Sequence, residues 1–210
     1  MQKKITKNLI LLASLATFFT FLESSPGAQG LPAPLPMEKL KFTKTIKKII
    51  KKGQVYAESK VTTPKPGRQK LAFRMAGLHP KSCRFAWRKL ALYENYSEYL
   101  GFVQQSSYQD GRVNFLLVSS ILPIKMRLAF KLPRIKGVGL YNFSFDRGFL
   151  KGLLGEIHIT QANKGAQCFF YLRADWLGAD SGHSNILFEF FSEALAKLGM
   201  ENLFRISKTY

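Results

Sequence analysis

Residues 185–206 read NILFEFFSEALAKLGMENLFRI, and this stretch decides the fold. Its apolar residues recur at offsets of three, seven and ten and form one face of a helix: Phe188, Phe191, Leu195 and Leu198. Its charged residues recur every four positions and form a polar stripe: Glu189, Glu193, Lys197 and Glu201. The spacing predicts one long amphipathic helix, and its apolar face must pack on a sheet.

The segments before this helix supply that sheet. Between residues 124 and 132, apolar and polar side chains alternate, which is typical of a strand with one buried and one solvated face. Asp110-Gly111 is a strong hairpin signal between strands at residues 102–108 and 112–122. Three further strands are predicted at residues 138–145, 154–160 and 166–176.

Ahead of these strands, residues 69–76 are extended, and two short helices follow at residues 80–92 and 95–100. The order is therefore one strand, two helices, about six antiparallel strands and a long helix. We predict an α+β fold over residues 69–210, with a curved antiparallel sheet of about seven strands wrapped around the C-terminal helix.

The N-terminus predicts a cleavable signal peptide over residues 1–30. Three lysines precede the uncharged residues 9–22, and Ala28-Gln29-Gly30 is a small-x-small cleavage site. The uncharged run of about 14 residues would span roughly 21 Å as a helix, short of the roughly 30 Å hydrocarbon core, which argues against a permanent anchor. We expect a mature, soluble protein that begins near Leu31 and is periplasmic or secreted.

The chain of 210 residues carries a net charge of +19. The signal segment holds three of the 32 basic and one of the 13 acidic residues, so the net charge of the remainder is +17. Residues 31–68 form a proline-containing linker and a basic extension, in which residues 38–52 fit a basic amphipathic helix or an added strand. Such a surface attracts anionic lipid, acidic polysaccharide or nucleic acid, or is simply a solvated face.

Export favours an anionic membrane surface over a nucleic acid as the partner of this extension. We assign the basic surface to Lys47, Lys48, Lys51 and Lys52. The two cysteines, Cys83 and Cys168, either form a disulfide, which an oxidising compartment permits, or remain free buried thiols. Neither cysteine has metal-ligand spacing, and we predict no metal and no cofactor.

Two stretches resemble the helix-grip fold of the START-like (SRPBCC) superfamily, which includes polyketide cyclases and the coenzyme-Q-binding family. They are RKLALYENYSEYLGFV at residues 88–103 and FLKGLLGEI at residues 149–157. Gly101 and Ile157 depart from the family pattern, where a proline and an aromatic residue are common. The resemblance implies an elongated cavity between the sheet and the last helix that holds a lipid, sterol, isoprenoid quinone or polyketide, and it supplies no universal catalytic residue.

We therefore expect a carrier or sensor of a hydrophobic ligand. The alternatives are an enzyme of the cyclase or hydrolase type that uses the same cavity, or an interaction module that works through its basic surface. The residues expected to line the cavity are apolar or aromatic: Met126, Leu128, Phe130, Tyr141, Phe143, Phe145, Phe170, Leu172, Trp176, Phe188, Phe191 and Leu195.

No residue is assigned a catalytic role. Glu156 and His158 share a strand face, but the opposite face is the apolar one, so we expect the pair to face solvent. Residues 180–184 bring Asp, Ser and His together, yet residues this close in sequence rarely reach triad geometry, and Ser184 is better placed as a helix N-cap. We interpret His79 as a loop or cap residue and His183 as part of a glycine-containing turn.

Overall fold

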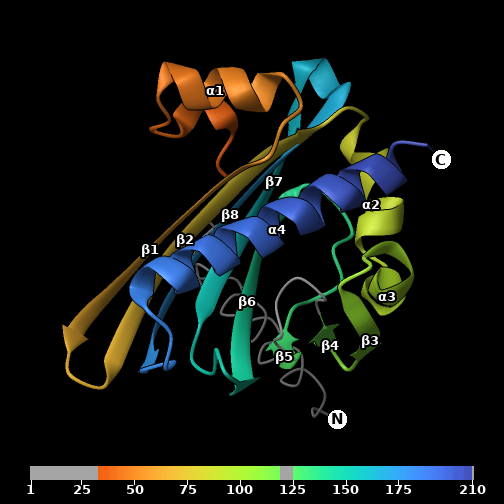
Figure 1. Cartoon of the computed structure of the whole chain (residues 1–210). Coiled ribbons are helices and arrows are strands. Elements are labelled where there is room, and N and C mark those ends of the chain that lie inside the picture. Colours follow the sequence, from red (N-terminus) through yellow and green to blue (C-terminus); the bar gives the residue numbers. More distant parts are fainter. Residues whose placement is uncertain (1–32, 119–124, 210) are drawn as a thin grey trace, which may run out of the picture. The chain divides into compact units, whose positions relative to one another are not determined.

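The computed structural model describes residues 33–118 and 125–209 (Figure 1). The predicted signal segment lies outside these residues. Eight strands form one antiparallel sheet in the order β1-β2-β8-β7-β6-β5-β4-β3. Their bounds are β1 Tyr56–Lys65, β2 Arg68–His79, β3 Val103–Gln109, β4 Arg112–Val118, β5 Lys125–Lys131, β6 Gly139–Gly148, β7 Leu154–Ala162 and β8 Gln167–Ala179.

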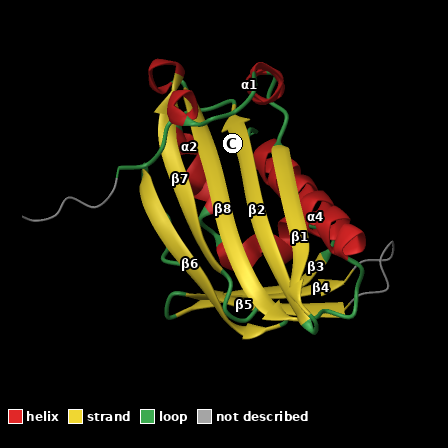
Figure 2. Cartoon of the chain, turned by 90° about the vertical axis from the view of Figure 1, so that its left-hand side faces the viewer, coloured by secondary structure: helices red, strands yellow, loops and turns green. Residues whose placement is uncertain are grey.

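The sheet is strongly curved. Figure 2 shows β6, β7, β8, β2 and β1 running side by side, with β5, β4 and β3 turned across their ends. Asp110 and Gly111 have φ values of 51° and 74°, as a tight hairpin between β3 and β4 requires. Gly155 in β7 lies directly under the Phe143 ring of β6, because a Cβ at position 155 would come within 2.3 Å of that ring. This close approach brings an aromatic side chain onto the inner face of the sheet.

The helices lie before β1, between β2 and β3, between β7 and β8, and after β8. Their bounds are η1 Met37–Lys39, α1 Lys44–Lys51, α2 Cys83–Leu90, η2 Tyr93–Asn95, α3 Tyr96–Tyr99, η3 Asn163–Gly165 and α4 Asn185–Ser207. The Ser184 hydroxyl accepts a hydrogen bond from the Leu187 N–H at 3.3 Å, which confirms the predicted N-cap of α4. No helix within the described ranges is both long enough and apolar enough to cross a membrane.

The long helix α4 crosses the concave face of the sheet (Figure 1). Two glutamates of the polar stripe on α4 form hydrogen bonds with the sheet. Glu193 Oε1 accepts the Ser59 N–H and Glu189 Oε1 accepts the Val61 N–H, both at 2.6 Å. These amides belong to the edge strand β1, so the two carboxylates satisfy backbone donors that an edge strand leaves unpaired.

The C-terminal half of α4 is anchored to the end of β2. The Phe204 ring lies over Gly77, where a Cβ would come within 2.8 Å of it. His79 is fully buried and its Nε2 lies 3.0 Å from Ser207 Oγ. The prediction that His79 is a loop or cap residue is therefore wrong, because the last turn of α4 covers the end of β2.

The N-terminal extension packs on the opposite, convex face of the sheet. Residues 38–52 contain a basic amphipathic helix, α1, and not an added strand. An apolar cluster on the convex face, separate from the core under α4, joins this extension to β2 and β8: Met37, Phe42, Ile50, Ala76, Leu78, Phe169 and Tyr171. Since β1 also precedes Gln69, the sheet starts earlier in the chain than the expected domain of residues 69–210.

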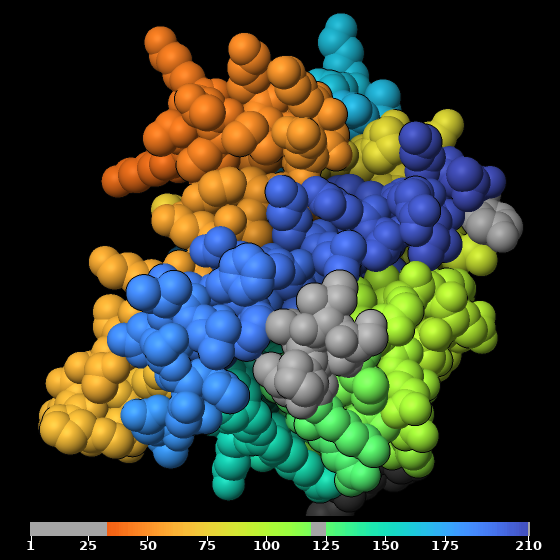
Figure 3. Space-filling model, viewed as in Figure 1, coloured from red at the N-terminus to blue at the C-terminus, as the bar shows by residue number. Residues whose placement is uncertain are grey.

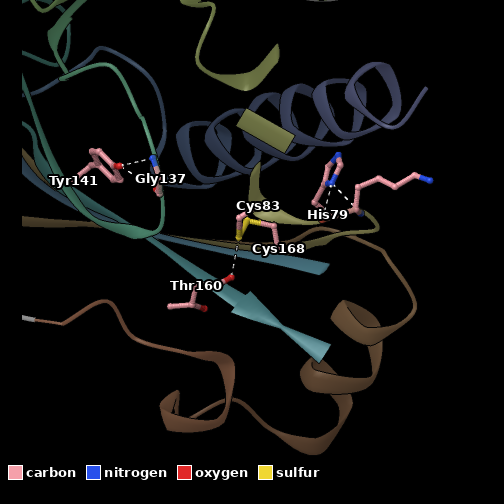
Figure 4. The surroundings of a disulfide bond; sticks show 7 residues. His79, Cys83, Gly137, Tyr141, Thr160 and Cys168 are labelled. Atoms are coloured by element: carbon pink, nitrogen blue, oxygen red, sulfur yellow. Dashed lines mark hydrogen bonds between the residues drawn. A yellow bond between two sulfur atoms is a disulfide. The ribbon is translucent and has the colours of Figure 1, made fainter. Parts of the chain in front are cut away.

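The two cysteines form a disulfide between the first residue of α2 and β8 (Figure 4). Cys83 and Cys168 are both buried, and Cys83 Sγ lies 3.3 Å from the Thr160 carbonyl oxygen of β7. The bond closes a loop of 85 residues. Of the two alternatives left open by the sequence, the disulfide is the one that the fold contains.

Candidate functional site: a cavity between the sheet and α4

A cavity of about 630 Å³ lies between the concave face of the sheet and α4. This volume is within the range of roughly 300–1,000 Å³ that is typical of small-molecule sites. Its walls come from strands β2 to β8, from the region of α2 and α3, and from one face of α4. Nearly all the lining side chains are aliphatic or aromatic, so the space suits an apolar molecule.

Ten of the twelve residues expected from the sequence line this cavity: Met126, Leu128, Phe130, Phe143, Phe145, Phe170, Leu172, Phe188, Phe191 and Leu195. Tyr141 and Trp176 are not among the lining residues. The Tyr141 hydroxyl turns back to the loop before β6, where it accepts the Gly137 N–H at 3.0 Å and donates to the Gly137 carbonyl at 2.9 Å. Trp176 is buried between Phe149 and Phe188, and its indole N–H donates to the Lys151 carbonyl at 3.1 Å.

Sequence reasoning missed two parts of the wall. One is the inner face of β2, formed by Leu71, Phe73 and Met75, whose alternation with exposed residues was visible in the sequence. The other comes from the helical region between β2 and β3: Leu90, Tyr93, Tyr96, Leu100 and Phe102. Their place in the wall depends on how this region folds back on the sheet, and no local pattern carries that information.

The tyrosine hydroxyls in the wall are already used within the protein. Tyr96 O–H donates to the Leu90 carbonyl at 2.7 Å. Tyr93 O–H donates to the Pro133 carbonyl at 3.3 Å and accepts the Ile135 N–H at 3.2 Å. Burial raises the pKa of both phenols, so both stay protonated. This part of the cavity therefore presents mainly hydrocarbon to a ligand.

The polar lining residues come from a few positions, among them Lys125, Ser181 and His183. The loop that carries Ser181 and His183 is held by Gln69, which is buried in β2. Gln69 Nε2 donates to the His183 carbonyl and Gln69 Oε1 accepts the Ser181 N–H, each at 2.9 Å. The loop before α4 is thus fixed where its side chains reach the cavity.

The pair formed by Glu156 and His158 lies on the convex face, away from the cavity. The expectation that the pair faces solvent is wrong for His158, which is 3% exposed because the N-terminal extension covers it. His158 Nε2 lies 3.2 Å from Glu156 Oε2, and its Nδ1 accepts the Leu35 N–H at 3.2 Å. Burial lowers the pKa of His158. Both ring nitrogens are engaged, so the pair serves to hold the extension.

The four lysines of the predicted basic surface lie on and just after α1. Lys48, Lys51 and Lys52 are exposed and Lys47 is half-buried, while Ile50 of the same segment is fully buried against the sheet. The lysines are therefore presented by a docked helix. The face drawn in Figure 3 shows surface atoms of both the orange segment that contains α1 and the blue segment that contains α4. Among the described residues, no group of three His, Cys, Asp or Glu side chains could hold a metal ion.

No family model and no curated protein matches the chain. Solved structures do match in fold. A conserved protein from Geobacillus kaustophilus superposes with a TM-score of 0.54 at 11% identity, covering 65% of this chain and 94% of its own. A START superfamily protein from Mycobacterium smegmatis gives a TM-score of 0.51 at 9% identity, covering 66% of this chain and 99% of its own.

A structure of Ara h 8.0201 matches with a TM-score of 0.52 at 9% identity, over 67% of this chain and 99% of that protein. Sequence identities this low establish the fold alone. They confirm the prediction from the sequence: the chain has the START-like helix-grip fold, an α+β architecture in which a curved antiparallel sheet wraps a C-terminal helix.

Proposed function

We propose that this protein binds a hydrophobic small molecule, a lipid or an isoprenoid such as a quinone, in the cavity between the sheet and α4. The observation that carries the proposal is an apolar cavity of about 630 Å³ in a fold of START type. Burying about 300 Å² of apolar ligand surface would contribute roughly 7 kcal/mol before the costs of association. That is enough for useful affinity without any catalytic step.

The test is to fill the cavity. Ala196 lines it and Ala194, two positions earlier in α4, is exposed. Ala196→Phe is expected to reduce binding of a neutral fluorescent probe, N-phenyl-1-naphthylamine, at least tenfold, while Ala194→Phe leaves it unchanged; a factor of ten corresponds to about 1.4 kcal/mol. Circular dichroism of both variants shows whether each remains folded. Equal binding by two folded variants would overturn the proposal.

Export by a cleavable signal peptide is also part of this proposal. The disulfide between Cys83 and Cys168 supports it, since such bonds persist in oxidising compartments. The intact mass of the protein purified from the cell that makes it is the direct test. A chain that begins near Leu31 and is recovered outside the cytoplasm is expected. A cytoplasmic chain that retains residues 1–30 would exclude export.

We further propose that α1 guides the protein to an anionic membrane surface. Replacing Lys47, Lys48, Lys51 and Lys52 with Glu is expected to weaken binding to anionic vesicles at low salt. The matched control reverses four exposed lysines elsewhere, Lys131, Lys136, Lys151 and Lys208, which changes the net charge by the same amount. Equal losses in the two variants would mean that net charge, and not α1, determines vesicle binding.

The alternatives make different demands on the cavity. An interaction module with its cavity closed by aromatic side chains does not fit a cavity of about 630 Å³. An enzyme of the cyclase or hydrolase type needs an ionisable group beside the reacting atoms. The lining residues that the structure describes include no Asp or Glu. Apart from tyrosines, the ionisable ones are Lys125 and His183, both exposed, and the Tyr93 and Tyr96 hydroxyls bond to backbone groups. Ligand binding without chemistry is the simpler use of this site.

A further inference from the structure

We infer that the ligand is an anionic amphiphile, with an apolar body inside the cavity and a carboxylate or phosphate head beside Lys125. This inference rests on the proposed function and adds the chemical class of the ligand. It starts from the charges of the wall. Among the lining residues that the structure describes, Lys125 carries the one permanent charge, and no carboxylate faces the cavity.

Lys125 stands at the edge of the apolar lining. It is the first residue of β5, it is exposed, and it pairs across the sheet with Val118, the last residue of β4. Val118 and Met126, the residue that follows Lys125, also line the cavity. Lys125 is therefore at the border of the apolar lining, because its neighbours Val118 and Met126 belong to the wall while its own side chain is exposed to water. Such a position suits the boundary between the tail and the head of an amphiphile.

Nothing in the described structure neutralises Lys125. Within residues 33–118 and 125–209, carboxylates form ion pairs with Arg74, Arg112, Arg134 and Arg173, and Glu156 also contacts His158. Lys125 forms no such pair there. An anionic head group would supply the missing partner through a charge-assisted hydrogen bond.

Apart from the exposed His183, the rest of the wall offers little to a polar head. Tyr93 and Tyr96 hydroxyls are bonded to backbone groups, as described above. Ser192 Oγ forms a hydrogen bond with Ser59 Oγ at 2.7 Å. It also lies 2.9 Å from two backbone carbonyl oxygens of its own helix, to which its hydroxyl donates. Ser181 Oγ accepts the His183 N–H at 3.2 Å. A charged head placed deep in the cavity would lose its hydration without gaining partners, so it is expected at the edge.

The test compares charged and neutral ligands of one chain length. Palmitate, hexadecyl phosphate and the neutral ester methyl palmitate each displace N-phenyl-1-naphthylamine from the full mature chain. Lys125→Met is expected to weaken palmitate and hexadecyl phosphate about five- to tenfold, the size of one charge-assisted contact at an exposed site, and to leave methyl palmitate unchanged. Lys125→Glu is expected to weaken the anions further. Lys131→Met, at the other end of β5, is the control and is expected to change nothing.

The outcomes separate the two proposals. A loss confined to palmitate would assign a carboxylate head, a loss confined to hexadecyl phosphate would assign a phosphate head, and both support the inference. An equal change for charged and neutral ligands in Lys125→Met, or an equal loss of the anions in Lys131→Met, would overturn it while leaving the cavity as a hydrophobic site. Failure of every compound to displace the probe from the wild-type chain would count against the proposed function itself.

Discussion

The imidazole of His79 joins the end of β2 to the last turn of α4, with Nε2 at 3.0 Å from Ser207 Oγ. The Lys81 N–H donates to His79 Nδ1 at 3.1 Å, and the Lys81 carbonyl oxygen lies 3.3 Å from the same nitrogen. Ser207 O–H in turn donates to the Leu203 carbonyl at 2.6 Å. Both side chains are fully buried. This chain of bonds fixes the helix that covers the cavity.

Protonation of His79 is expected to weaken the fold. Burial lowers its pKa, so the unfolded chain binds the proton more readily than the folded protein. The free energy of unfolding should therefore fall as the pH falls below about 6.5, the ordinary pKa of histidine. In urea titrations between pH 8 and 5, His79→Gln should show a shallower pH dependence than wild type. Ser207→Ala keeps the titrating group, and should lower stability by about 1–3 kcal/mol with the slope retained. Identical slopes for wild type and His79→Gln would refute the assignment.

The contacts from Glu189 and Glu193 to β1 predict a local effect. Glu193→Ala should expose the Ser59 amide, whose hydrogen exchange should accelerate, and should cost about 1–3 kcal/mol because a hydrogen bond to a charged acceptor is lost. Glu193→Gln keeps an acceptor oxygen and should restore much of the protection. Glu201→Ala, on the same helix, serves as the comparison. Unchanged exchange at Ser59 in Glu193→Ala would show that α4 does not hold the edge strand in solution.

Reduction of the disulfide is expected to destabilise the domain. A cross-link that closes a loop of 85 residues lowers the conformational entropy of the unfolded chain. Removing it should therefore lower the free energy of unfolding by about 2–4 kcal/mol. Thermal unfolding of wild type with and without dithiothreitol measures this, and Cys83→Ser/Cys168→Ser should match the reduced protein. A double variant as stable as the oxidised wild type would contradict the prediction.

The contact between Gly155 and Phe143 predicts a strong, coupled effect. The Cβ of Gly155→Ala would come within 2.3 Å of the Phe143 ring and 2.8 Å of the Arg173 carbonyl oxygen, so we expect a loss of about 1–3 kcal/mol from overpacking. In a double-mutant cycle, Phe143→Leu should reduce the penalty of the alanine. If the losses of stability from Gly155→Ala and Phe143→Leu are additive, the Phe143 ring is not the reason why position 155 requires glycine.

Much of this architecture was predictable because its signals are local. The period of apolar residues in residues 185–206 predicts α4, and the alternation in residues 124–132 predicts β5. Ten of the twelve residues expected from these helix and strand periods lie in the cavity wall. The periods could not distinguish cavity from packed core, and Trp176 belongs to the core because Phe149 and Phe188 cover its ring.

The sequence by itself determined the order of the elements from β2 onward and most of the faces that they bury, since these depend on side-chain periodicity along a single segment. Only the tertiary structure decided which distant groups meet. The Cys83–Cys168 bond, the burial of His79 and His158, the bonds from α4 to β1, and the place of Lys125 at the edge of an apolar cavity all join segments far apart in the chain. Their positions follow from the curvature of the sheet and the packing of α4 and the N-terminal extension on its two faces, which no local pattern encodes.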